Sequence, residues 1–108
     1  MKRGEIVIAA ERGRLSAKPR PWLVVQSDAY NALHPSLTLC LITSMKTGAV
    51  QFRIAVQAST ENGLDEASEV MVDKLVTLSR ESIVRVVGTL EPAPLADVDA
   101  ALRRWLDL

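Results

Sequence analysis

Apolar residues occur in short runs along the chain, separated by polar segments rich in Gly, Pro, Ser and Asn. Several runs are rich in β-branched residues or alternate apolar with polar positions, and both patterns are typical of β-strands. They predict six short strands, over residues 5–10, 22–26, 36–43, 52–57, 69–78 and 83–90. The run 36–43 is apolar at nearly every position, which predicts a central strand that is buried on both faces.

The end of the chain has a helical period instead. One face of the predicted helix, which we expect to be core, carries the apolar residues Leu95, Val98, Leu102, Trp105 and Leu106. Pro94 suits the first turn of a helix, and Arg103 and Arg104 suit its last turn, where the helix dipole favours cations. A further short helical turn is predicted over residues 27–31.

The segments between these elements are predicted loops. Residues 11–21 contain three Gly or Pro residues and no regular period, which indicates a long, mobile loop. Asn62 and Gly63 form a turn dipeptide, and Gly88 within the last strand indicates a bulge or a close backbone approach. With 108 residues, the chain is predicted to be one domain, mainly β, in which a small curled sheet or partly open barrel is covered by the terminal helix.

The charge balance is zero overall but uneven along the chain, with 13 Lys and Arg against 13 Asp and Glu. Residues 1–20 carry six basic and two acidic side chains, whereas residues 61–75 carry five acidic ones and a single lysine. Separation in sequence is not separation in space, so the basic and the acidic segment are free to lie close together in the fold.

Composition excludes several classes of site. Cys40 and His34 are single residues of their type, which excludes a disulfide framework, a cysteine-rich zinc site and a multi-histidine metal site. No apolar run approaches the ~20 residues of a membrane helix. We therefore expect a soluble, cytoplasmic protein with no metal and no cofactor. Cys40 is best explained as a core thiol and His34 as a solvent-facing turn residue.

Three places offer candidate chemistry. Arg20, fixed between two prolines at the end of the basic loop, presents a fork of donors that suits phosphate oxygens, although a surface arginine at a loop exit has the same pattern. Thr43 and Ser44 end the central strand, where hydroxyls either hold a phosphate or cap a turn. Asp73 and Lys74 lie within a strand, whose period of two puts them on opposite faces, or they form an exposed pair.

The sequence contains none of the common glycine-rich nucleotide-binding motifs, and it lacks the catalytic motifs of serine hydrolases and zinc proteases. An enzyme with so few side chains of catalytic type works by positioning and charge stabilisation. Cleavage of RNA suits this, because the 2′-hydroxyl of RNA supplies the nucleophile.

Six short segments, in order, resemble the MazF/PemK family of toxin endoribonucleases. Residues 3–7, RGEIV, are similar to the family's opening strand, and residues 20–28, RPWLVVQSD, to its R-P block. The remaining similarities are LITS at residues 41–44, the segments 63–64 and 68–73, and VVGTL at 86–90 followed by the terminal helix. Each segment alone is weak evidence for the resemblance, but the order and spacing of the whole set across the chain are specific to the family.

The resemblance implies a small SH3-like barrel with added helices, and a homodimer. It also implies cleavage of single-stranded RNA without a metal, by attack of the 2′-hydroxyl, to leave a 2′,3′-cyclic phosphate and a 5′-hydroxyl, with a cognate antitoxin that blocks the site. The family's arginine maps onto Arg20, which stabilises the transition-state phosphate and can donate a proton. Its threonine maps onto Thr43, which orients the phosphate. Further RNA contacts are expected from Arg12, Arg14, Lys18, Ser44, Asp73 and Lys74.

Two departures from the family pattern leave the general base open. Val76 stands where many members have an arginine, and residues 15–18, LSAK, stand where many have a Glu or His. Lys18, Asp73, Lys74 and a reaction without a base are the alternatives. Two other functions stay open as well: a CcdB-like toxin that traps DNA gyrase through a terminal tryptophan, and an inactive SH3-like binding module.

Overall fold

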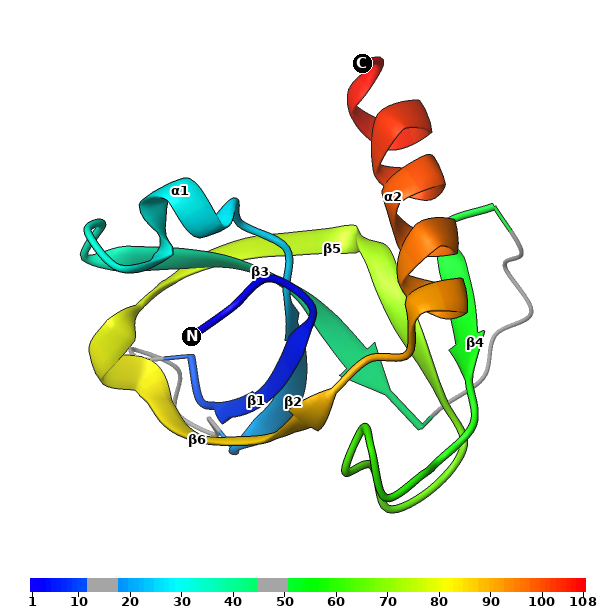
Figure 1. Ribbon diagram of the computed structural model, residues 1–108, viewed down its shortest axis with the longest axis horizontal. Coiled ribbons are helices and arrows are strands. Elements are labelled where there is room, and N and C mark those ends of the chain that lie inside the picture. The colour runs from blue at the N-terminus through cyan, green and yellow to red at the C-terminus, as the bar shows by residue number, and fades with distance from the viewer. Residues whose placement is uncertain (12–17, 45–50) are drawn as a thin grey trace.

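The computed structural model of the protein describes residues 1–11, 18–44 and 51–108. Its strands and helices follow one another along the chain as β1 (Glu5–Ala9), β2 (Arg20–Val24), α1 (Asp28–Asn31), β3 (Ser36–Thr43), β4 (Arg53–Val56), β5 (Ser68–Ser79), a 3-10 turn (Arg80–Ser82), β6 (Ile83–Thr89) and α2 (Pro92–Leu106). Figure 1 shows the strands curling around a centre, with α2 standing to one side. Among the described residues, no helix has the length and apolar character needed to span a membrane.

The strands form one antiparallel sheet in the order β4-β5-β3-β2-β1-β6. The first strand therefore pairs with the last, through Glu5 opposite Thr89 and Ala9 opposite Ile83. The sheet curls but is not closed, because its hydrogen-bonded order starts at β4 and stops at β6. This confirms the prediction of a mainly β fold with a curled sheet and a terminal helix.

Alternation along the central strands produces two apolar clusters, one on each face of the sheet. Ile6 and Leu23 belong to the cluster that α2 covers, whereas Val7 and Trp22 belong to the second cluster. The Trp22 indole donates a buried hydrogen bond from Nε1 to the carbonyl oxygen of Ala9 (3.1 Å), which joins β1 to β2. β3 lies between β2 and β5 and is buried on both faces, as its continuous apolar pattern predicts.

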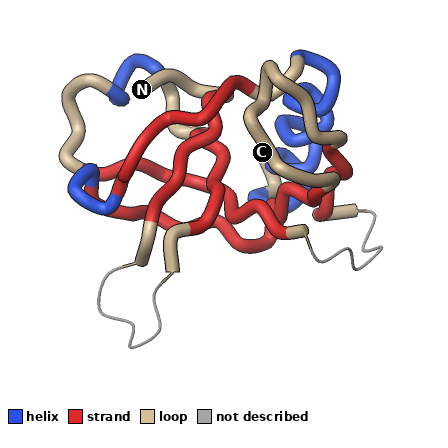
Figure 2. The backbone as a smooth tube through the Cα atoms, turned by 90° about the horizontal axis from the view of Figure 1, so that it is seen from below, coloured by secondary structure: helices blue, strands red, loops and turns tan. Residues whose placement is uncertain are grey.

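Helix α2 begins two residues before the predicted Pro94, at Pro92, with Glu91 as its N-cap. Val98 and Ala101 are buried against the sheet. The prediction that Trp105 and Leu106 are core is wrong: they are 45% and 47% exposed. Trp105 packs edge-on against Phe52, with ring centroids 5.0 Å apart. The last turns of α2 extend beyond the strands (Figure 1), so the helical period continues where the sheet no longer covers it. Figure 2, seen from below, shows α2 at one side of the strands.

The predicted turn at Asn62 and Gly63 is present and tightly held. Asn62 is fully buried, and Gly63 has a φ of +73°. The Asn62 Oδ1 accepts from the backbone N–H of Ser59 (3.1 Å) and of Leu64 (3.0 Å), while its Nδ2 donates to the Gln57 carbonyl (2.8 Å). The loop between β4 and β5 is therefore fixed by side-chain to backbone hydrogen bonds.

Gly88 makes the close approach that its position in a strand predicts. A Cβ at Gly88 would lie 2.4 Å from the backbone carbon of Asn62, so the turn packs directly on β6. The pairing of β1 with β6 shifts register beside Gly88, between the pairs Ile6–Gly88 and Val7–Val86. Both features proposed for this glycine, the irregular pairing and the backbone contact, are confirmed.

Candidate active site

Arg20 is the first residue of β2, two residues earlier than the strand start predicted from the sequence. It pairs with Ala9 of β1, and its side chain is exposed. Pro19 and Pro21 on either side restrict the backbone, which reduces the entropy lost when the guanidinium is held in one place. Within the described part of the chain, the Arg20 guanidinium has no ion-pair partner, so its donors are available to a ligand.

Thr43 ends β3 and lies opposite Glu69 of β5. The pairing of β2 with β3 places Trp22 opposite Leu41. Continuing that register by two residues places Arg20 opposite Thr43, on the same face of the sheet. Strand pairing thus brings together two residues that are 23 positions apart in the sequence.

A groove of about 390 Å³ joins these side chains. Three segments line it, namely residues 18–21, residues 42–44, and a stretch of the loop before β5 that includes residues 64–66 and Ser68. Four predicted site residues, Lys18, Arg20, Thr43 and Ser44, therefore share one groove. Its volume lies within the ~300–1,000 Å³ of small-molecule sites, which is enough for a nucleotide.

Asp73 and Lys74 are not part of this groove. The register of β3 with β5 shifts between the pairs Cys40–Leu75 and Leu41–Met71, so strict alternation is interrupted at residues 72–74. Asp73 accepts two hydrogen bonds from Arg53, from Nε to Oδ1 (2.8 Å) and from Nη2 to Oδ2 (3.0 Å). The hydrogen bonds from Arg53 hold the pKa of the Asp73 carboxyl below its usual range.

The remaining sequence candidates divide into two groups. Arg12 and Arg14 lie outside the described residues. His34 and Cys40 are placed as predicted: His34 is exposed in a turn, where its Nδ1 accepts from the Ser36 N–H (3.1 Å), and Cys40 is completely buried. Burial raises the pKa of the Cys40 thiol to about 12, so it is not a nucleophile at neutral pH.

Asp65 and Glu66 line the groove, although no sequence motif pointed to them. The one available signal is the acidic character of residues 61–75. The structure brings two of those acids to the groove that holds Lys18 and Arg20, the last basic residues of the positive N-terminal segment. The end of the basic segment and part of the acidic segment therefore lie close together, with two positive and two negative side chains in one groove.

Known proteins are similar to this chain over most of its length. Residues 2–106 match the family model described as PemK-like, MazF-like toxin of type II toxin-antitoxin system. A probable endoribonuclease MazF from Mycolicibacterium smegmatis is 36% identical over 108 residues, covering 100% of this chain and 98% of that protein. Endoribonuclease MazF6 from Mycobacterium tuberculosis is 35% identical over 98 residues, covering 89% and 85% of the two chains.

Solved structures share the fold. The MazE–MazF complex from Deinococcus radiodurans (form III) superposes with a TM-score of 0.84 at 23% identity, over 100% of this chain and 97% of the matched one. An endoribonuclease in complex with its cognate antitoxin, from a mycobacterial species, gives a TM-score of 0.82 at 21% identity, over 100% and 96%. The chain belongs to the PemK/MazF family, the MazF-type toxin endoribonucleases of type II toxin–antitoxin systems.

Family membership confirms the resemblance seen in the sequence. The two relatives described above match most of this chain, and both are named endoribonucleases. Their names do not favour the alternative functions of a gyrase inhibitor or an inactive binding module.

Proposed function

We propose that the groove binds a phosphodiester of single-stranded RNA and that the protein cleaves it without a metal ion. The observation that carries the proposal is the presence of Arg20, Thr43 and Lys18 in one groove, in a chain of this family. A guanidinium and an ammonium beside a strand-end hydroxyl match the charge and the hydrogen-bond acceptors of a phosphate.

The proposed reaction needs little from the protein. The 2′-oxygen forms a bond to phosphorus while the bond from phosphorus to the 5′-oxygen breaks, giving a 2′,3′-cyclic phosphate and a 5′-hydroxyl. Arg20 donates hydrogen bonds to the phosphate oxygens, on which charge develops, and supplies a proton to the departing 5′-oxygen. Thr43 and Ser44 orient the phosphate for this in-line displacement.

Position relative to the groove favours one of the candidate general bases over the others. Asp73 is held by Arg53 in its ionised form, and neither Asp73 nor Lys74 lines the groove. Lys18 does line it. A scheme in which charge stabilisation supplies most of the rate, with water taking the 2′-hydroxyl proton, fits a site of this composition.

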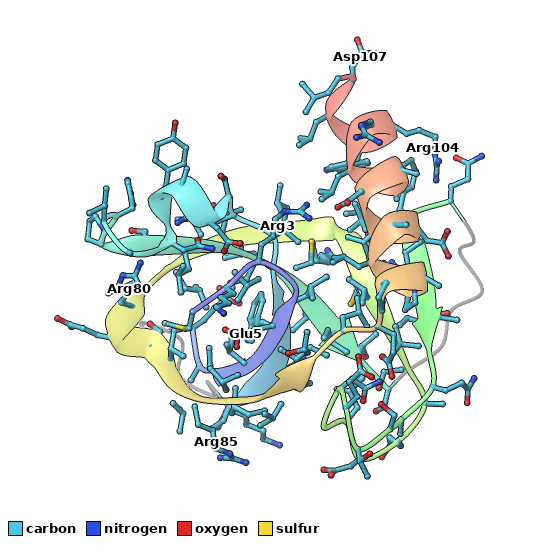
Figure 3. The ribbon with its side chains drawn as sticks, viewed as in Figure 1. Arg3, Glu5, Arg80, Arg85, Arg104 and Asp107 are labelled. Carbon is cyan, nitrogen blue, oxygen red and sulfur yellow. The ribbon has the colours of Figure 1, made fainter. Side chains whose placement is uncertain are left out.

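The decisive experiment is cleavage of single-stranded RNA in EDTA by the wild-type protein and three variants. We expect Arg20→Ala to be slower by about 10²–10³, the typical cost of removing one preorganised charge contact, and Thr43→Ala to be slowed less. Arg104→Ala is the matched control, because this arginine of α2 lies outside the groove and donates to the Gln51 carbonyl (2.9 Å; Figure 3).

The product ends and the fold of each variant complete the experiment. New 5′-ends that accept a labelled phosphate without prior dephosphorylation identify 5′-hydroxyls. Near wild-type cleavage by Arg20→Ala would remove Arg20 from the mechanism, and a wild-type protein inactive in EDTA would contradict metal-independent cleavage. Unfolding of Thr43→Ala, seen by circular dichroism, would show that its hydroxyl is a structural cap.

Three further features belong to the proposal: a homodimer, a cognate antitoxin and action on RNA in the cytoplasm. Exposed Val84 and Val86 on the edge strand β6 support a self-associating surface, which light scattering at micromolar concentration tests. The positive segment 11–21 supports an antitoxin with an acidic or amphipathic segment that excludes RNA. Binding of antitoxin to a complex with uncleavable RNA, without displacement of the RNA, would contradict that exclusion.

A further inference from the structure

The groove has an acidic part that the proposed reaction does not use. Asp65 and Glu66 are exposed side chains of the loop before β5, and both line the groove with Arg20 and Thr43. Within the described residues, neither carboxylate has a hydrogen-bond or ion-pair partner. Two unpartnered carboxylates beside a phosphate site lower its attraction for phosphate, so they call for an explanation.

The backbone that carries these acids is fixed at both ends. On one side, the Leu64 N–H donates to the buried Asn62 side chain (3.0 Å). On the other, the Ser68 hydroxyl donates to the carbonyl oxygen of Glu66 (2.9 Å). Carboxylates on a fixed loop present their acceptors in a defined place, which is what selective recognition needs.

The charges of the groove define what can occupy each part of it. Phosphate oxygens are acceptors and belong beside Lys18 and Arg20. A carboxylate is also acceptor-only, so it repels a phosphate and requires a donor. In single-stranded RNA the donors are the amino and imino groups on the Watson–Crick edges of the bases. Guanine alone presents two adjacent donors there, N1–H and the N2 amino group, which match the two oxygens of one carboxylate.

We propose that Asp65 and Glu66 recognise a guanine next to the cleaved phosphate and so set the sequence preference of cleavage. This inference rests on the proposed function of the groove. Half-buried Leu64, which lines the same groove, provides an apolar contact for the face of the base. Phosphate binding beside Arg20 and base recognition by the acids thereby occupy different parts of one site.

The test compares wild type with Asp65→Asn, Glu66→Gln and the double variant. Wild-type cut sites are first mapped on a long single-stranded RNA, and short RNAs are then made with each of the four bases at the two nucleotides flanking the cut. An amide offers one donor and one acceptor, so it cannot accept from both N1–H and the N2 amino group of guanine, and it pairs with adenine or cytosine as well. Glu61→Gln is the matched control, an exposed acid near the same turn that does not line the groove.

We expect wild type to prefer guanine at one flanking position, and the ratio of guanine to adenine cleavage to fall about tenfold or more in at least one groove variant. The control keeps the wild-type ratio. An unchanged ratio in all three groove variants overturns the inference, and so does a uniform loss of rate with every base, which would assign the acids to proton transfer. A wild-type protein that cuts none of these RNAs instead refutes the proposed function.

Discussion

Replacing Asp73 by Asn tests whether this residue binds RNA or holds the fold together. In the structure its carboxylate receives two hydrogen bonds from Arg53, at 2.8 and 3.0 Å, and joins β4 to β5. The two side chains are 12% and 24% exposed, so the pair is partly shielded from water. Asp73→Asn keeps the shape of the side chain but removes the negative charge that accepts these two hydrogen bonds from Arg53.

The expected loss follows from this geometry. Asparagine keeps one acceptor oxygen, so one of the two hydrogen bonds is lost. A hydrogen bond to a charged group contributes about 1.5–3 kcal/mol, and partial exposure of the pair keeps the loss toward the lower end. We expect the free energy of unfolding to fall by about 2 kcal/mol. For a domain of this size that corresponds to a decrease in Tm of roughly 10 °C. RNA affinity of the folded protein should stay at the wild-type level.

The pH dependence supplies a second, independent check. The Asp73 pKa is lowered in the folded state by hydrogen bonds from Arg53, so its contribution to stability is fully present above its unfolded pKa of about 3.9. It is lost as the pH falls through the lower, folded pKa. Urea unfolding should therefore show a constant difference between wild type and Asp73→Asn from pH 5 to 7, and a shrinking difference below pH 4.

The control is Asp107→Asn, an exposed aspartate at the end of α2 in the left-handed conformation that asparagine also adopts (Figure 3). It should unfold like wild type at every pH. Two results would refute the reasoning: equal stability of Asp73→Asn and wild type at pH 7, or weaker RNA binding by a variant that is fully stable. The second result would return Asp73 to the RNA contacts predicted from the sequence.

Two further predictions concern the turn at residue 63 and the buried thiol. Gly63→Ala should lower the free energy of unfolding, measured in urea, by about 2 kcal/mol or more. The φ of +73° strains an L-residue, and the new Cβ would lie 2.2 Å from the Val87 carbonyl oxygen. An unchanged urea midpoint would show that the loop moves aside. Cys40 should react with a thiol reagent at pH 8 about 10³-fold more slowly in the native protein than in urea, because burial raises its pKa to about 12. Equal reaction rates would contradict the burial of this thiol.

The sequence predicts the strands well where each one's burial is set by local pattern. The continuous apolar run of β3 predicts a strand between two others, and this is confirmed, because Leu39 and Cys40 face opposite sides and are both buried. The terminal helix is also predicted correctly, because its apolar residues recur with a helical period. Its period does not reveal where the sheet ends, and so it assigns Trp105 to a core that no longer extends that far.

The candidate site is predicted only in part, because it is assembled by strand pairing. Arg20 and Thr43 each have a local signature, a proline pair and a strand end, and pairing of β2 with β3 brings them together. Asp65 and Glu66 have no local signature that separates them from ordinary loop acids. Their place in the groove follows from the turn at Asn62 and Gly63, a tertiary feature that a linear pattern does not contain.

The pairing of β1 with β6 has a consequence for how the protein is made. During synthesis the first strand leaves the ribosome long before residues 83–89 exist, so its open edge has no partner until the chain is nearly finished. Contacts between such distant segments form slowly, because the whole intervening chain must be ordered to close them. The turn at Asn62 packs on Gly88 of β6 and leads into the loop that lines one side of the groove, so this side is supported only after the last strand docks. Translation interrupted before residue 83 therefore leaves a fragment in which this side of the groove lacks the strand that it packs against.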